Sequence, residues 1–524
     1  MAIEIFETGR FSSRVIGNNQ PDFYQTNQDQ FEIVQTGGGR DTIFVQPNRR
    51  QIVGETVFDM YLISLPPDVV DAGEGEDRIL IAATGGAILG GDENDVIRSV
   101  ASAAAQRRDD ILLIFGDDSS ITNTNGHGDD TIFAGTANEL IDGGGGVDTV
   151  SYTFSDSFMG ISLFEPNPGN GFFSGRAVSA NGSEDVLNRV ENIIGSQYDD
   201  FIFGNSLSNQ LEGGRGSDNI QAGGGNDDVR GDRGNDILAG GDGNDTIRGG
   251  NGNDDISGDA GNDALFGGSG NDIVRPGRGF DVADGGRGND TIDYAQADGP
   301  VFVNLAQGFA NTQLGRAVEI DTLSRFENVV GSIFDDFIFG NAGANRIEGR
   351  NGRDSIAGLD GNDIISGGSD RDLLFGNQGD DAISGGRDND TIDGGFGDDF
   401  LVGNAGADLI RGGPGEDILI GGAGANTYLW LPDDLSGETD SIIDFAPLFG
   451  ETLRFEGVFA PGTDAEDVIS AVSLGDDAAL ILDLEESLIE NPVGTKINFA
   501  NLRDFDAETI NFSFWQNIGT IEFI

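Results

Sequence analysis

A nine-residue repeat dominates the chain and keeps its phase over two long stretches. From Gly195 to Asp293 and from Gly331 to Leu429, eleven successive units in each stretch follow the pattern G-G-x-G-x-D-x-U-x, where U is apolar. Position six is aspartate in ten units of the first array and in nine of the second, and Asn209, Asn345 and Asn426 are the exceptions. A period this short and this strict predicts a solenoid of stacked coils.

Each unit divides into a turn and a strand. The residues G-G-x-G-x-D are expected to form the turn, because glycine tolerates positive φ. The residues x-U-x are expected to form a short strand whose central side chain faces inward. Two units make a coil of eighteen residues, so Asp218 should stack on Asp236 along one edge.

Stacked turns of this kind need a cation. Carboxylates repeated at a strand spacing of about 4.8 Å repel one another unless a positive charge lies between them. Calcium takes six to eight oxygen ligands, including carboxylates and backbone carbonyls, and glycine-rich turns expose such carbonyls. The spacing therefore predicts Ca²⁺ between successive turns.

The nonapeptide resembles the RTX, or haemolysin-type, calcium-binding repeat. The resemblance implies an all-β fold of right-handed parallel β-rolls, or β-helix solenoids, that hold multiple Ca²⁺ ions. It also implies that the position-six aspartates are calcium ligands. In the arrays these are Asp200, Asp218, Asp227, Asp236, Asp245, Asp254, Asp263, Asp272, Asp281, Asp290, Asp336, Asp354, Asp363, Asp372, Asp381, Asp390, Asp399, Asp408 and Asp417.

The arrays are separated by two spacers and flanked by less regular segments. Degenerate units that keep aspartate at position six, among them Asp130 and Asp148, predict an irregular β-roll with fewer calcium sites at the N-terminal end. The two spacers are duplicates, expected to contain short strands that cap one roll and begin the next. The expected parts are a degenerate roll (1–151), a β spacer (152–194), a roll (195–293), a second spacer (294–330), a second roll (331–429) and a C-terminal β capping region (430–524).

Folding of the arrays is expected to depend on calcium. One buried aliphatic side chain per unit removes too little apolar surface from water to offset the ordering of nine residues. The free energy of calcium binding then becomes folding free energy, and the arrays should be disordered without the ion.

The resemblance also implies a route out of the cell. RTX proteins leave Gram-negative bacteria unfolded through a type I exporter, which implies an extracellular or cell-surface location and the exporter as a partner. The N-terminal sequence MAIEIFETGRFSSRV lacks the features of a Sec-type signal peptide. The final residues, Glu522, Phe523 and Ile524, resemble the C-terminal signal of type I substrates.

Composition excludes several classes of function. A formal net charge of −62, with one lysine, disfavours binding to nucleic acid or to anionic membranes. No apolar run is long enough to span a membrane as a helix. The only histidine, His127, cannot supply a zinc-protease H-E-x-x-H motif, and no lipase elbow or P-loop is present.

Three roles remain, and the residues do not decide between them. A structural, surface-layer or fibril protein that associates with itself is the first prediction, and no enzymatic activity is expected. A secreted adhesin or toxin-like binding protein is the second, with Phe172 and Phe173 of the first spacer as candidate contacts. A carboxylate-based enzyme acting on polysaccharides is the third.

Overall fold

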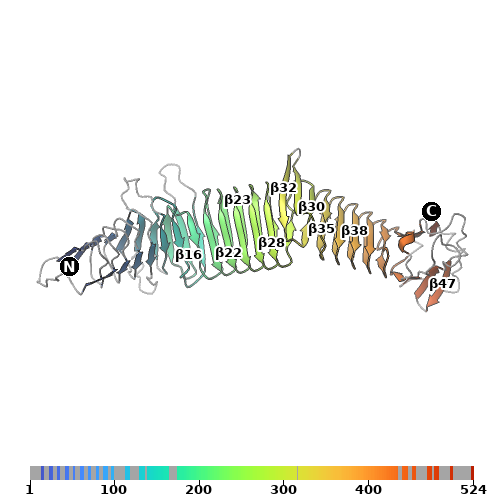
Figure 1. The fold of residues 1–524 in the computed structure, drawn as a ribbon, viewed down its shortest axis with the longest axis horizontal. Coiled ribbons are helices and arrows are strands. Elements are labelled where there is room, and N and C mark those ends of the chain that lie inside the picture. The colour runs from blue at the N-terminus through green and yellow to red at the C-terminus, as the bar shows by residue number, and fades with distance from the viewer. Residues whose placement is uncertain are drawn as a thin grey trace. The chain divides into compact units, whose positions relative to one another are not determined.

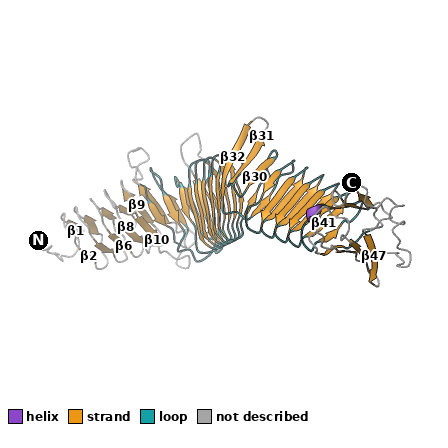
Figure 2. Cartoon of the chain, turned by 45° about the vertical axis from the view of Figure 1, so that its right-hand side comes forward, coloured by secondary structure: helices purple, strands orange, loops and turns teal. Residues whose placement is uncertain are grey.

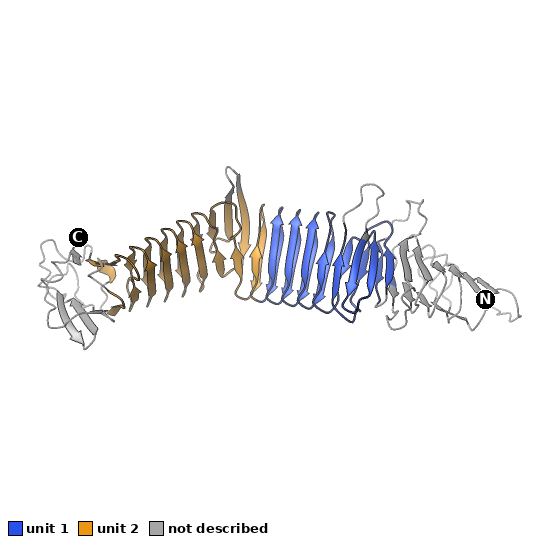
Figure 3. Cartoon of the chain, turned by 180° about the vertical axis from the view of Figure 1, so that it is seen from behind, with its two compact units in different colours: residues 1–270 blue, residues 271–524 orange. Residues whose placement is uncertain are grey.

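The computed structural model describes residues 129–434, except 136–137, 165–173 and 315–316, together with residues 439–445 and 451–455. It also gives the backbone of strands between residues 13 and 117 and between residues 469 and 523. The chain divides into two compact units, residues 1–270 and 271–524 (Figure 3). Strands make up almost all of the regular structure, which confirms the predicted all-β fold (Figure 1).

In the first unit, successive strands alternate between two parallel sheets. Each residue pairs with the residue eighteen positions later, as in Ile220 with Leu238 and Ile247 with Leu265. The predicted coil of two nonapeptides is therefore confirmed. One sheet contains β20 (Gln210–Arg215), β22 (Asp228–Arg233), β24 (Thr246–Asn251) and β26 (Ala264–Ser269), and the other contains β21 (Asn219–Gly224), β23 (Ile237–Asp242) and β25 (Asp255–Ala260).

The second unit repeats this arrangement. Ile347 pairs with Ile365 in one sheet and Ile356 with Leu374 in the other. The first sheet contains β35 (Arg346–Asn351), β37 (Ile364–Ser369), β39 (Ala382–Arg387), β41 (Phe400–Ala405) and β43 (Ile418–Ile420). The second contains β36 (Ser355–Asp360), β38 (Leu373–Gln378), β40 (Thr391–Phe396), β42 (Leu409–Arg411) and β44 (Thr427–Trp430).

The strands inside the arrays are longer than expected. Most of them run for six residues, from position seven of one unit to position three of the next, so only positions four to six form the turn. The expectation of a six-residue turn was wrong, because Gly223 and Gly224 also pair in register with Gly241 and Asp242. The position-eight side chains form the core between the sheets, and Ile220, Ile247 and Leu374 are fully buried.

The first spacer adds two extra strands to one sheet of the first unit. In that sheet β17 (Glu184–Asn188) pairs with β13 (Glu139–Asp142), and β15 (Met159–Ser162) pairs with β19 (Phe201–Phe203). Between them β16 (Ser174–Ser179) is antiparallel to both. The other sheet runs on directly through β14 (Thr149–Ser151), β18 (Asn192–Ile194) and β20.

The second spacer has the same topology within the second unit. There β28 (Val282–Arg287) pairs with β32 (Ala317–Ser324), β31 (Phe309–Leu314) is antiparallel, and β30 (Val301–Asn304) pairs with β34 (Phe337–Phe339). The other sheet continues from β29 (Thr291–Asp293) through β33 (Asn328–Val330) to β35. Strands β31 and β32 project beyond their neighbours (Figure 2). The expectation that the spacers cap one roll was wrong, because strand pairing passes through both of them.

Parallel ladders also extend through the N-terminal residues. Their strands are β1 (Ser13–Ile16), β2 (Phe23–Thr26), β3 (Glu32–Gln35), β4 (Thr42–Val45), β5 (Gln51–Val53), β6 (Met60–Ile63), β7 (Val69–Asp71), β8 (Arg78–Ile81), β9 (Gly86–Gly91), β10 (Val96–Ser99), β11 (Leu112–Asp117) and β12 (Thr131–Phe133). The same parallel pairing therefore continues through these strands, and a degenerate β-roll with the bounds 1–151 remains a prediction. Several residues named in the sequence analysis lie outside the described residues: the aspartates of the earlier degenerate units, His127, Phe172 and Phe173.

At the C-terminal end two further strands extend the ladders of the second unit. Strand β45 (Thr439–Ile442) pairs with β43, and β46 (Thr452–Phe455) pairs with β44. Beyond them β49 (Lys496–Phe499) and β50 (Ile521–Phe523) add to the same ladders, and β47 (Ile469–Leu474) and β48 (Asp477–Leu482) form a hairpin. The domain boundaries and the export signal remain predictions.

Candidate metal centre

The position-six aspartates form a column along each edge of the coils. The Oδ1 atom of Asp218 accepts a hydrogen bond from the backbone N–H of Asp200 at 2.7 Å, and that of Asp236 accepts one from Asp218 at 2.8 Å. The same bond links Asp354 to Asp372 at 2.9 Å in the second unit. Each carboxylate is thereby fixed by the coil before it, which places the acid groups one above another.

The second carboxylate oxygen in these columns is buried and accepts no hydrogen bond within the described part of the chain. All of these side chains are at most 3% exposed. Placing an ionised oxygen in such a position is costly unless a cation compensates it. The Oδ2 atoms concerned belong to Asp218, Asp227, Asp236, Asp245, Asp290, Asp354, Asp363, Asp372, Asp381, Asp390, Asp399, Asp408 and Asp417.

Backbone carbonyl oxygens converge on the same points. A Cβ atom added to Gly231 would collide with Asp236 Oδ2 and would lie 2.8 Å from the carbonyl oxygen of Gly249 in the next coil. A Cβ added to Gly367 would meet Asp372 Oδ2 and the Gly385 carbonyl oxygen in the same way, the latter at 2.8 Å. Two oxygens from different coils therefore face one small space that glycine leaves open.

This donor set fits calcium. Calcium binds carboxylate and carbonyl oxygens at 2.3–2.6 Å in flexible geometries. Among the described residues no three acidic, histidine or cysteine side chains group together as a metal site. Each site would therefore combine one aspartate per turn with backbone carbonyls, which is why glycine at position one matters. The ion would supply the positive charge that the buried Oδ2 atoms lack.

Burial changes the acidity of the columns. It raises the pKa of Asp218, Asp372 and Asp417 to about 8 from an ordinary value of 3.8, and that of Asp227 and Asp363 to about 7. Neighbouring carboxylates add to the effect at Asp218 and Asp372, where charges one coil away disfavour ionisation. In the absence of a cation, Asp218, Asp372 and Asp417 of the folded columns thus favour the protonated form at neutral pH.

These pKa shifts predict how pH acts on the protein in a calcium chelator. Between about pH 4 and pH 8 the folded chain binds protons that the unfolded chain has released, so the calcium-free fold loses stability as pH rises through this range. We expect a stronger β signal in far-UV circular dichroism at pH 5 than at pH 7.5 in chelator, and equal signals in saturating Ca²⁺. A calcium-free β signal that is weaker at pH 5 than at pH 7.5 would contradict the assignment.

The structure places every sequence-predicted site residue in these columns. All of the aspartates expected as ligands are buried, including Asp130 and Asp148 in the degenerate region. Asp254, Asp263 and Asp290 accept backbone N–H bonds from the previous coil like the others, at 2.8–2.9 Å. Their role as calcium ligands remains a prediction.

Sequence reasoning missed the glutamates that carry the columns across the spacers. Glu191 Oε2 accepts the backbone N–H of Asp148 at 2.9 Å, and Glu327 Oε2 accepts that of Asp290 at 2.8 Å. The shared dipeptide Glu-Asn at the end of both spacers was a signal that could have revealed them.

The C-terminal segment continues both columns as well. Asp417 donates its backbone N–H to Asp440 Oδ1 at 3.3 Å, and Asp440 Oδ2 accepts the indole N–H of the buried Trp430 at 2.7 Å. Asn426 donates its side-chain amide to Glu451 at 3.2 Å. Asp440 and Glu451 therefore accept hydrogen bonds from the last residues of the two columns, Asp417 and Asn426.

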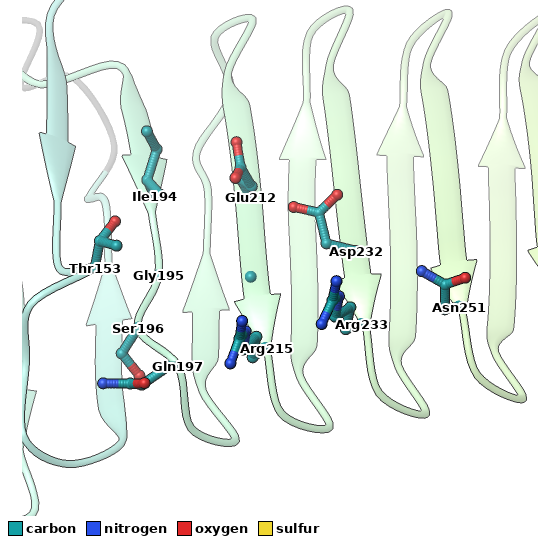
Figure 4. A pocket seen from close by; sticks show the side chains of 11 residues that line it. Thr153, Ile194, Gly195, Ser196, Gln197, Glu212, Arg215, Asp232, Arg233 and Asn251 are labelled. Carbon is teal, nitrogen blue, oxygen red and sulfur yellow. The ribbon is translucent and has the colours of Figure 1, made fainter.

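A pocket of about 550 Å³ lies at the start of the first array, and Ser196, which binds Asp200, is among its lining residues (Figure 4). Its lining includes Glu212, Asp232, Arg215 and Arg233, which come from the neighbouring strands β20 and β22. Burial, followed by the charge of Asp232, raises the pKa of Glu212. The lining residues include neither a histidine nor a paired nucleophile and base, so the pocket does not identify a reaction.

Comparison with known protein families finds a match to the nonapeptide repeats. A family model described as the RTX calcium-binding nonapeptide repeat matches residues 126–151, 203–238, 239–274, 266–298, 330–365, 357–392 and 393–428. No curated protein matches the chain. Among solved structures, the crystal structure of extracellular lipase LipA from Serratia marcescens is similar at 20% identity and a TM-score of 0.20, over 55% of this chain and 40% of that chain. The match thus spans less than half of the lipase, and a TM-score this low supports no functional inference.

Proposed function

Because the chain carries RTX calcium-binding nonapeptide repeats across residues 126–428, we propose that it is exported unfolded through a type I exporter and folds on Ca²⁺ outside the cell. The observation that carries this proposal is the series of buried Oδ2 atoms, several of which, such as those of Asp236 and Asp372, face a backbone carbonyl of the next coil. At the micromolar or lower free calcium of a cytosol these columns would stay uncompensated, whereas extracellular modules bind calcium with dissociation constants of about 10⁻⁴–10⁻³ M.

We further propose a structural role at the cell surface, as a surface-layer or fibril protein. Each array buries its position-eight side chains between its own two sheets, and the chain carries a net charge of −62. A net charge this far from zero opposes association of the copies, so the proposed assembly would require cations that compensate the charge. No catalytic role is proposed, and among the described residues no helix is long and apolar enough to cross a membrane.

A binding role is the second candidate, and exposed aromatic rings favour it. Phe154, Phe158, Phe164, Phe201 and Phe203 of the first spacer region are each between 40% and 50% exposed. Exposed aromatic side chains gathered along one segment are typical of surfaces that bind a partner. An adhesin would use such a surface to bind its ligand. A surface-layer protein would need exposed aromatic rings only where one copy contacts another.

Calcium addition followed by light scattering and electron microscopy distinguishes the two roles. We expect the calcium-loaded full chain to form extended assemblies that disperse in chelator, with Mg²⁺ as the control ion. Monodisperse particles in saturating Ca²⁺ would exclude the lattice role and leave the binding role. A variant with Phe201 and Phe203 changed to serine then tests whether cell attachment depends on the exposed rings.

A further inference from the structure

The turns of each array fall into two classes. In the turn that follows each spacer, position two is a serine whose backbone N–H binds the position-six carboxylate. Ser196 N donates to Asp200 Oδ2 at 2.5 Å, and Ser332 N donates to Asp336 Oδ2 at 2.6 Å. The serine hydroxyls donate to the other carboxylate oxygen at 2.9 Å and 2.7 Å. We call these closed turns, because the chain itself satisfies both carboxylate oxygens.

The next turn after each spacer is closed in a different way. Here position six is asparagine, and its Oδ1 accepts the backbone N–H of position two, from Asn205 to Asn209 at 3.0 Å and from Asn341 to Asn345 at 2.8 Å. The amide group then donates to a spacer carbonyl, which is Glu191 for Asn209 at 2.7 Å. Asn345 makes the same bond to the carbonyl of Glu327, also at 2.7 Å. The side-chain amide of asparagine thus occupies the position of the second carboxylate oxygen. Because the amide donates a hydrogen bond to a carbonyl, this turn needs no cation.

The turns that follow are open. Their position-two residue lies at positive φ, for example Gly214 at 105°, Gly241 at 101° and Asp232 at 71°. In the closed turns the position-two residue is outside this region, which aims its N–H at the position-six side chain. Within the first array, the buried Oδ2 atoms that accept no bond from the described residues begin at Asp218, which belongs to the first open turn after Asn209.

We propose that each spacer and its two closed turns form a calcium-independent folding nucleus, on which the calcium-dependent open turns stack. The inference rests on the proposed calcium-dependent folding and assigns its starting points. It also removes Asp200 and Asp336 from the set of calcium ligands. The remaining array would then order coil by coil from the nucleus as the ion becomes available.

The second spacer contains the contacts that such a nucleus requires. Its three strands are joined in sequence by antiparallel pairing, which forms quickly because the contacts are local. Phe302 stacks on Phe309 with ring centroids 5.6 Å apart and lies 5.8 Å from Phe339. The buried Tyr294 hydroxyl donates to Asp321 at 2.9 Å. These contacts involve no turn oxygen that needs an ion.

Hydrogen exchange of the full chain in chelator at pH 7.5 tests the proposal. We expect protected amides in residues 192–212 and 328–348 and unprotected amides in residues 354–411. Changing Asn209 and Asn345 to aspartate should reduce the protection of both segments by about tenfold or more, because each change buries a carboxylate against a carbonyl oxygen. The matched control is N244D/N362D, which makes the same charge change at exposed positions and should leave protection unaltered.

The outcomes separate this proposal from the proposed function. Uniform exchange in chelator with full protection in Ca²⁺ would overturn the nucleus and leave calcium-dependent folding intact. Protection throughout both arrays in chelator would overturn calcium-dependent folding itself. Should N209D/N345D prove unable to fold even in Ca²⁺, a second variant, S196G/S332G, gives position two the residue of open turns. Unchanged protection in that variant would also contradict the proposal.

Discussion

A chain with Asp372 and Asp390 both changed to asparagine is expected to need at least about tenfold more Ca²⁺ to fold its second array. Substitution of even outer-shell partners of a metal typically costs about 10–100-fold in affinity, and these carboxylates are placed as direct ligands. Asparagine keeps the Oδ1 atom that accepts the backbone N–H of the previous coil, at 2.9 Å for both residues. Only the buried Oδ2 atom of each residue is replaced by an amide nitrogen.

The control for this variant changes two exposed aspartates of the same array. Asp360 and Asp398 are exposed, so D360N/D398N alters the net charge equally and leaves the columns untouched. Calcium binding measured by titration calorimetry and folding measured by circular dichroism should both shift in D372N/D390N alone. An equal shift in both variants would mean that overall charge, and not these sites, sets the calcium requirement.

Changing Gly361 to alanine is expected to remove at least about 2–3 kcal/mol of stability from the calcium-loaded protein. Gly361 has φ of 117°, a conformation that costs an L-residue about 1–3 kcal/mol. Its added Cβ would also lie 2.6 Å from the backbone carbonyl carbon of Gly343 one coil earlier. The coil spacing cannot widen to relieve this overlap without breaking strand pairing on both sides.

Gly343 provides the matched control one coil earlier in the same column. It occupies the same position of a closed turn, is outside the positive-φ region, and its added Cβ would meet only Asn341 Oδ1 at 3.3 Å. We expect G343A to change stability by less than about 1 kcal/mol. Urea unfolding at fixed saturating Ca²⁺ measures both variants, and equal losses would contradict the difference between open and closed turns.

The fold was predictable because a single period determines it. Nine residues with one apolar position specify the coil, its core and the stacking of Asp218 on Asp236, since every unit favours the same turn and the same strand. The spacers were harder to interpret from sequence. Their strands are ordinary, and nothing in residues 152–194 says that β16 reverses direction while the other sheet continues. The direction of β16 depends on which strands of the folded sheet are available for pairing. That availability is set by the tertiary structure and not by the local sequence.

The candidate site was only partly predictable. Position six marks the carboxylates, but the sequence does not show which oxygen is satisfied by the chain. The difference between Asp200 and Asp218 depends on the backbone conformation at Ser196 and Gly214, four residues before each aspartate. The asparagines at 209 and 345 looked like lapses in the repeat. In the structure they are the donors that let the turn close without an ion.

Far-UV circular dichroism of the full chain during a Ca²⁺ titration tests the central claim most directly. The chain is first stripped with chelator at pH 7.5, and Mg²⁺ serves as the control ion. Buried Oδ2 atoms that require a cation predict a cooperative gain of β signal at sub-millimolar to millimolar Ca²⁺, without an equivalent gain in Mg²⁺. A complete β spectrum already present in chelator, unchanged by Ca²⁺, would show that the columns are compensated without calcium and would contradict calcium-dependent folding.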